Sequence, residues 1–195
     1  MLLVRQFVNW RWPEQTVSSA MIKEIGMWLV GFVLIIIVKF GEGLPLKSIG
    51  LQSSQLFKSL LWSLLLTLVC FVAAGIFVAI THFNGGKNAE SLSKLPLWLA
   101  TAIVVRAGVV EELCYRGYAI ERLHALGLPR GLAAAIPLVI FGVGHWTGGL
   151  LNIGLALLLG AILALFYLWR RDLAANMIGH TLVDFIPNIL PKLFR

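Results

Sequence analysis

The sequence predicts an all-α fold: a polytopic membrane bundle of about six transmembrane helices. Of its 195 residues, 59% are hydrophobic and 13% are charged, a composition typical of integral membrane proteins. Apolar stretches long enough, or nearly so, to cross a bilayer occupy most of the chain, at about 20 residues for each crossing. We therefore expect a single membrane domain over residues 1–195, with little left for a soluble domain.

Turn-forming residues separate the first three predicted spans. Residues 1–20 mix aromatic and basic side chains, as an interfacial arm does. The first span should end at the Gly-Glu-Gly-Leu-Pro turn of residues 41–45, and the second at Asn84, which two glycines follow. A polar loop should then lead to Pro96. The three spans are expected at residues 21–40, 60–83 and 97–120.

The second half of the chain contains three further predicted spans. Pro137 should kink the fourth, because proline removes a helix hydrogen bond. The fifth is rich in Leu, Ala and Gly and should serve packing. Pro187 should bend or break the sixth. These spans are expected at residues 132–146, 150–169 and 173–194.

The net charge of +7 does not indicate nucleic-acid binding. The basic residues stand singly between apolar segments, without a basic run or interleaved aromatic residues, so membrane lipid headgroups are their expected partners. We expect a multi-pass protein of the cell membrane. Basic residues are divided evenly between the two predicted sides, so they do not predict its orientation.

Residues 109–123 place charged side chains in an otherwise apolar helix, where each charge costs several kcal/mol. Glu112 and Arg116 are four residues apart, so they share a helix face and can form a structural ion pair. Glu111 points elsewhere and is predicted to be the unpaired carboxylate, available to accept a proton or bind a metal. Arg106 is predicted to face lipid or a loop.

Four ionisable residues on three predicted helices form the candidate site: Glu111, His145, His180 and Asp184. Such groups usually face the bundle interior and meet one another, and helix geometry predicts that these four converge within about one to two turns. They form a plausible nitrogen and oxygen ligand set for a divalent metal, with Zn²⁺ the best match. Each residue could instead be structural, for example His180 and Asp184 as a pair that links helices.

The same residues also suit metal-free hydrolysis. Glu111 could act as general base on a water molecule shared with His145. His180 and Asp184 would then polarise the scissile carbonyl and stabilise the oxyanion. Because an ionised aspartate repels an oxyanion, Asp184 would have to be protonated, bind a metal or orient His180.

The motifs resemble those of a known family. The order EExxxR (Glu111, Glu112, Arg116), FxxxH (Phe141, His145) and HxxxD (His180, Asp184) resembles the CAAX protease and bacteriocin-processing family, intramembrane endopeptidases that include the type II CAAX prenyl proteases. The resemblance covers a catalytic core at about residues 97–187. It implies Glu111 as the catalytic carboxylate, His145 as an activator of water, and His180 with Asp184 as the second pair. Members are often named metalloproteases, and a metal-free glutamate mechanism is also argued for them.

We therefore predict an intramembrane endopeptidase that hydrolyses a peptide bond of a membrane-associated or lipidated protein or peptide. The alternative is a non-catalytic membrane scaffold or a protein of bacteriocin self-immunity, with a structural polar cluster. A proton-coupled transporter is a third possibility. The sequence contains no internal repeat, which counts against a transporter built from repeats.

Overall fold

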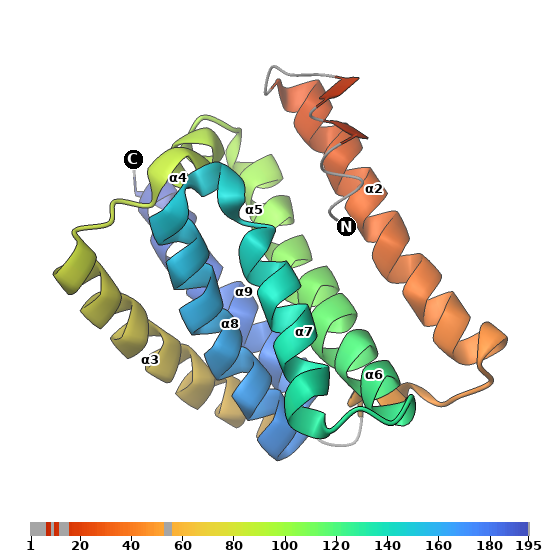
Figure 1. Ribbon diagram of the computed structural model, residues 1–195. Helices are drawn as coiled ribbons and strands as arrows, with labels where there is room; N and C mark the ends of the chain where they lie inside the picture. The colour runs from red at the N-terminus through yellow and green to blue at the C-terminus, as the bar shows by residue number, and fades with distance from the viewer. Residues whose placement is uncertain (1–6, 9, 12–15, 53–55, 195) are drawn as a thin grey trace.

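The computed structural model describes residues 7–8, 10–11, 16–52 and 56–194, and every regular element within them is helical (Figure 1). The all-α prediction is therefore confirmed. Three helices in this part of the chain are long and apolar enough to cross a membrane: Val17–Gly41, Leu56–Thr81 and Leu150–Arg170. The count of six transmembrane helices is not confirmed. Most of the predicted interfacial arm at residues 1–20 lies outside the described residues.

The first half of the chain follows the predicted order of helices. Thr16 caps the first long helix, accepting a hydrogen bond from the Ser19 backbone while Ser19 bonds back. The prediction of a loop before Pro96 is wrong in one respect, since this segment contains a helix of eight residues. The elements are α2 (Val17–Ile36), η1 (Ile37–Gly41), η2 (Leu46–Ile49), α3 (Leu56–Thr81) and α4 (Gly86–Ser93).

The third predicted span, which we call the third helix, is one continuous rod that continues beyond Ile120 to Ala125. It ends there because Gly127 adopts a left-handed conformation, with φ +98°, and Pro129 follows. Its middle is wound as a π-helix, which joins residues five apart and is frequent at functional sites. The segments are α5 (Leu97–Arg106), η4 (Ala107–Glu111), η5 (Leu113–Ile120) and α6 (Glu121–Ala125).

The remaining helices contain the two prolines that the sequence singles out. Pro137 lies inside one helix, and Pro187 lies in the last turn of another, which ends at Asn188 just beyond the His180–Asp184 pair. The elements are α7 (Arg130–Val143), η6 (Trp146–Gly148), α8 (Leu150–Arg170), α9 (Leu173–Asn188) and α10 (Leu190–Leu193).

Helix α9 is central to the bundle, packing against α3, α8 and the π-helical part of the third helix, while α7 packs against α8 (Figure 1). Gly108 permits the closest of these approaches. A methyl group at this position would meet the hydroxyl of Thr181 and would lie 2.8 Å from the carbonyl of Met177. The absence of a side chain at Gly108 thus brings the turn that carries Glu111 against the helix that carries His180.

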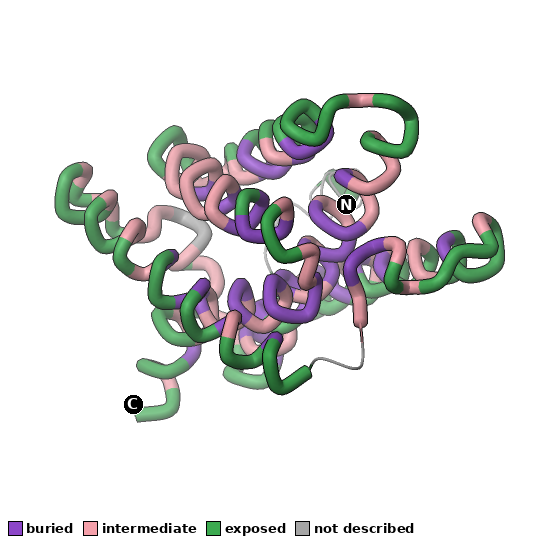
Figure 2. Tube along the Cα trace, turned by 90° about the horizontal axis from the view of Figure 1, so that it is seen from below, coloured by how far each residue is buried: buried purple, intermediate pink, exposed green. Residues whose placement is uncertain are grey.

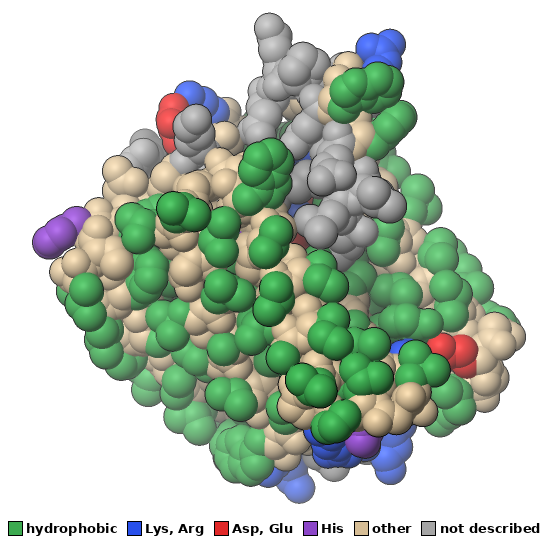
Figure 3. Space-filling model, in the orientation of Figure 1, with side chains coloured by type: hydrophobic (Ala, Val, Ile, Leu, Met, Phe, Trp, Pro, Cys, Tyr) green, Lys and Arg blue, Asp and Glu red, His purple; other side chains and the backbone are tan. Residues whose placement is uncertain are grey.

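The molecule has an apolar outer surface, and several charged and polar side chains are buried among the apolar residues of its interior. Large side chains such as Phe32, Leu68 and Leu165 are more than half exposed, and the buried residues face inward between the helices (Figure 2). Hydrophobic side chains cover most of the visible face, with charged groups mainly toward its two ends (Figure 3). An exposed apolar surface of this extent is what contact with lipid requires. The chain is an integral membrane protein.

The end of the first span is tied to the third helix by an ion pair outside the membrane-spanning segment. Arg122 Nε lies 2.9 and 2.8 Å from the two carboxylate oxygens of Glu42, and the Tyr118 hydroxyl donates to Oε1 at 3.1 Å. The hydrogen bond from Arg122 holds the pKa of Glu42 below its ordinary value of 4.5. Folding therefore favours the ionised form of Glu42.

We expect this pair to give the stability a defined pH dependence. A carboxyl group whose pKa is lowered by folding makes its full contribution to the stability of the fold at pH values above its ordinary pKa. This contribution is lost as the pH falls through the lowered pKa of the folded state. The pair is partly exposed, so its contribution is at most about 1 kcal/mol. The difference in apparent Tm between wild type and Glu42→Gln should be constant from neutral pH down to about 5 and should shrink below the ordinary pKa of 4.5. A difference that did not depend on pH would show that the charge of Glu42 contributes nothing.

Candidate active site

Glu112 is the centre of a fully buried polar cluster. Arg116 Nη1 donates to Glu112 Oε1 at 2.7 Å, and both side chains are at most 2% exposed. His180 Nδ1 lies 2.8 Å from the same oxygen, and Asn176 Nδ2 donates to Oε2 at 3.1 Å. Arg116 Nη2 also donates to the carbonyl of Gly160 at 3.0 Å. Both oxygens of Glu112 are thus engaged by buried groups, as befits a residue that holds three helices together.

Glu111 is not the unpaired carboxylate that the sequence predicts. Arg106 Nη1 donates to Glu111 Oε1 at 2.6 Å. The two residues are five apart, and the π-helical turn η4 places them on one face, whereas a regular α-helix would offset them. The side chain of Glu111 is 16% exposed, and no hydrogen bond between described residues involves Oε2. That oxygen can therefore receive a hydrogen bond from a substrate water.

The prediction that Arg106 faces lipid or a loop is wrong. Its side chain is 9% exposed and binds the carboxylate of Glu24 on α2, with Nε to Oε2 at 2.9 Å and Nη2 to Oε1 at 3.1 Å. Arg106 therefore joins two buried carboxylates from two helices. The guanidinium is shared because its fork of N–H donors reaches Glu24 on one side and Glu111 on the other.

His145 is held by the end of its own helix. Its Nδ1 lies 2.8 Å from the carbonyl oxygen of Phe141, and Asn152 Nδ2 donates to the His145 carbonyl at 3.0 Å. A carbonyl oxygen only accepts hydrogen bonds, so Nδ1 carries the proton in this contact. In the neutral ring Nε2 is then the unprotonated nitrogen. His145 can accept a proton or a hydrogen bond from water through Nε2.

His180 and Asp184 lie one turn apart on α9, with His180 Nε2 at 3.5 Å from Asp184 Oδ2. Because Nδ1 faces Glu112, the imidazole lies between two carboxylates. The ring of Phe141 packs against both histidines, with centroid distances of 4.7 Å to His145 and 6.3 Å to His180. Phe141 therefore fixes the separation of the two imidazoles.

Residues from the third helix, from the end of α7 and from α9 meet around the ring of Phe141, which lies 5.3 Å from the ring of Tyr115, between centroids, as well as beside both histidines. Asp184 joins this group through His180. The arrangement contains what hydrolysis requires: a carboxylate oxygen and an imidazole nitrogen that no hydrogen bond among the described residues engages, and an imidazole that can donate a hydrogen bond.

The four residues are not arranged as a metal cluster. Among the described residues no group of three or more His, Cys, Asp or Glu side chains has the geometry to hold a metal ion. One oxygen of Glu111 is bound to Arg106, and both nitrogens of His180 face carboxylates. The ligand set as arranged does not suit Zn²⁺, which takes four ligands at about 2 Å. The predicted divalent metal remains an expectation to be tested.

Sequence reasoning missed three residues of the site: Glu24, Arg106 and Asn176. The sequence does contain a signal for Glu24, because this residue stands within an apolar span, where a carboxylate needs a partner. Asn176 donates to Glu112 and to the carbonyl of Leu163, and its signal was its spacing, since it stands four residues before His180 and therefore on the same helix face.

The fold and the site together define a polytopic membrane protein with acid–base groups gathered in its interior. Residues 92–186, just under half of the chain, match the family model described as type II CAAX prenyl endopeptidase Rce1-like, so this segment is similar to that family of membrane endopeptidases. No curated protein and no solved structure matches the chain.

Proposed function

We propose that this protein is an endopeptidase of the cell membrane that hydrolyses a peptide bond of a membrane-associated or lipidated protein or peptide. The similarity of residues 92–186 to an endopeptidase family supports the class of reaction. The observation that supports the site is the position of Glu111: Arg106 holds one of its oxygens, and its chain neighbour Glu112 binds His180 at 2.8 Å.

In the proposed mechanism, Glu111 Oε2 and His145 Nε2 bind the attacking water. Glu111 takes a proton from the water while the water oxygen attacks the carbonyl carbon of the substrate. The carbonyl π electrons move onto the carbonyl oxygen, which becomes an oxyanion. His180, protonated on both nitrogens between Glu112 and Asp184, donates a hydrogen bond from Nε2 to this oxyanion, and Asp184 orients the ring. Collapse of the tetrahedral intermediate breaks the C–N bond, and the proton held by Glu111 passes to the leaving amine. The second proton of the original water leaves with the new carboxyl group.

Glu112 has a different role in this proposal. Both of its oxygens are engaged by Arg116, Asn176 and His180, and the side chain is 0% exposed. It therefore cannot reach a substrate water, and it acts by holding Nδ1 of His180 so that Nε2 is directed away from Glu112, to the side of Asp184.

The proposal is tested by comparing protein termini in host membranes that carry wild type, Glu111→Gln or no protein. Glutamine keeps the size of the side chain and an oxygen for Arg106, but it cannot accept the proton of water. New termini are expected only with wild type, after equal accumulation of both proteins has been shown by immunoblot. These termini would also identify the substrate class. Identical termini with wild type and Glu111→Gln would refute the catalytic role and favour the scaffold or self-immunity alternative.

The expected divalent metal can be tested with the same membranes and a substrate found in them. If the reaction needs a metal, incubation with a strong chelator should abolish cleavage, and Zn²⁺ should restore it. If the residues act alone, cleavage should continue unchanged in the chelator. Metal content of the purified protein, measured by mass spectrometry, provides an independent reading of the same question.

A further inference from the structure

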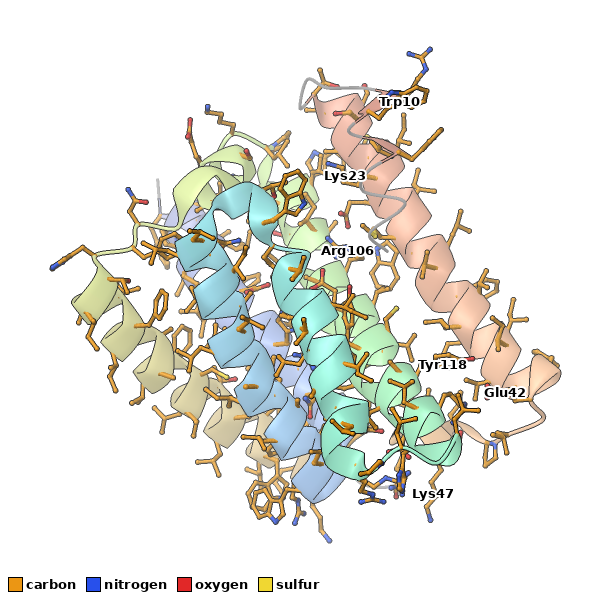
Figure 4. The ribbon with its side chains drawn as sticks, in the orientation of Figure 1. Trp10, Lys23, Glu42, Lys47, Arg106 and Tyr118 are labelled. Atoms are coloured by element: carbon orange, nitrogen blue, oxygen red, sulfur yellow. The ribbon has the colours of Figure 1, made fainter. Side chains whose placement is uncertain are left out.

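The first span, α2, is joined to the third helix at two separate points. Near one end, Glu24 binds Arg106, and near the other, Glu42 binds Arg122. Figure 4 shows Arg106 between α2 and the third helix, with Glu42 and Tyr118 together farther along. Between the two ion pairs, Gly31 packs closely against Val110. A methyl group added to Gly31 would lie 3.1 Å from the Val110 side chain. Only the first of these two ion pairs reaches the candidate active site.

The Glu24–Arg106 pair divides the guanidinium between two carboxylates. Glu24 takes Nε and Nη2, at 2.9 and 3.1 Å, which leaves Nη1 for Glu111 at 2.6 Å. An arginine without Glu24 could turn its fork to both oxygens of Glu111, as free arginines do with carboxylates. Glu24 therefore limits Arg106 to one oxygen of Glu111.

We propose that Glu24 is a positioning residue for Glu111, which makes α2 a functional part of the active site. Glu24 fixes Arg106, Arg106 fixes Oε1 of Glu111, and Oε2 stays available for the attacking water. This inference rests on the proposed function, because it assigns Glu24 a role in setting the geometry of the same carboxylate.

The kinetic test compares Glu24→Ala, Glu24→Gln and Glu42→Ala with wild type on a substrate identified from the termini. Partners that orient a catalytic group typically change activity about 10- to 100-fold, so Glu24→Ala should lower kcat by about that factor with little change in KM. Glu24→Gln keeps a hydrogen-bond acceptor for Arg106 and should retain more kcat than Glu24→Ala. Glu42→Ala, the matched control, removes the other ion pair of α2 and should stay close to wild type.

A general loosening of α2 would produce a different pattern. In that case Glu42→Ala would lower kcat as much as Glu24→Ala, and the positioning role would be wrong. A Glu24→Ala variant that cleaved as fast as wild type would also overturn the positioning role. Failure of wild type itself to cleave any protein would instead count against the proposed function, so the two failures are distinguishable.

A disulfide between α2 and the third helix separates tethering from positioning. A Cβ atom on Gly31 would lie 3.7 Å from Cβ of Val110, close to the mean of about 3.8 Å for disulfides. In a Gly31→Cys, Val110→Cys background, oxidation should fix α2 in place, and the reduced form of the same protein is the control. If Glu24 acts by positioning, Glu24→Ala should remain slow when the disulfide is closed. Recovery of kcat on oxidation would show that Glu24 is only a tether.

The coupling through Arg106 can also be measured without any cleavage. Effects of Glu24→Ala and Glu111→Ala on the apparent Tm should deviate from additivity by roughly 2–4 °C, since the two carboxylates share one guanidinium. In an Arg106→Gln background the deviation should vanish. Additive shifts in the presence of Arg106 would show that the two carboxylates are independent, and would overturn the inference whether or not the protein is a protease.

Discussion

Replacement of His145 by alanine is expected to lower kcat by about 10²–10⁴-fold, the range for loss of a positioned acid–base group. His145 Nδ1 is occupied by the Phe141 carbonyl at 2.8 Å, so Nε2 is the nitrogen that binds the water in the proposed mechanism. Without it, Glu111 must activate the water alone. The measurement is the rate of cleavage by purified protein in detergent or vesicles, with KM determined separately.

His124 supplies a matched control for this prediction. Its Nδ1 also lies near a backbone carbonyl four residues away, at 2.9 Å from Leu128, but the side chain is exposed at the end of the third helix. His124→Ala therefore removes the same kind of contact without touching the site, and its kcat should stay within a few-fold of wild type. Equal losses in the two variants would show that helix-end packing, and not proton transfer, accounts for the effect of His145.

The order of the helices was predictable because their boundaries are local. Gly41–Pro45, Asn84–Gly86 and Pro187 interrupt a helix through their own backbone preferences, whatever surrounds them. The π-helical middle of the third helix was not predictable in the same way. It lies where the third helix packs against α9, with Gly108 allowing close approach, and tertiary packing of this kind leaves no periodic signal in a single sequence.

The same contrast between local and tertiary causes explains which site residues the sequence predicts correctly. Glu112 and Arg116 are four apart on one helix, so the sequence alone predicts their 2.7 Å contact. The Arg106–Glu111 pair needs the wider π turn, and the Arg106–Glu24 pair joins residues 82 apart in the chain. Long-range pairing depends on how α2 docks, which spacing cannot predict. For this reason Arg106 was wrongly assigned to lipid, although an arginine in an apolar helix always needs a partner.

Replacement of Glu112 by alanine is expected to destabilise the fold by about 3–5 kcal/mol, the cost of breaking a buried ion pair from one side. Arg116 is 2% exposed and would keep only the Gly160 carbonyl, at 3.0 Å, and its contact with the Phe141 ring, at 4.6 Å. His180 and Asn176 would lose their partner in the same step. Unfolding in detergent, followed by circular dichroism, should show a much lower midpoint than for Glu111→Gln.

A double variant distinguishes this structural role from a catalytic one. In Glu112→Leu with Arg116→Met, both charges are replaced by apolar groups of similar size, which often restores the stability that one replacement removes. We therefore expect the double variant to unfold near the wild-type midpoint, although His180 would lack its Nδ1 partner and cleavage would remain slow. If Glu112→Ala instead unfolded like wild type while cleavage was abolished, Glu112 would be the catalytic carboxylate, and Glu111 would have to be assigned the structural role.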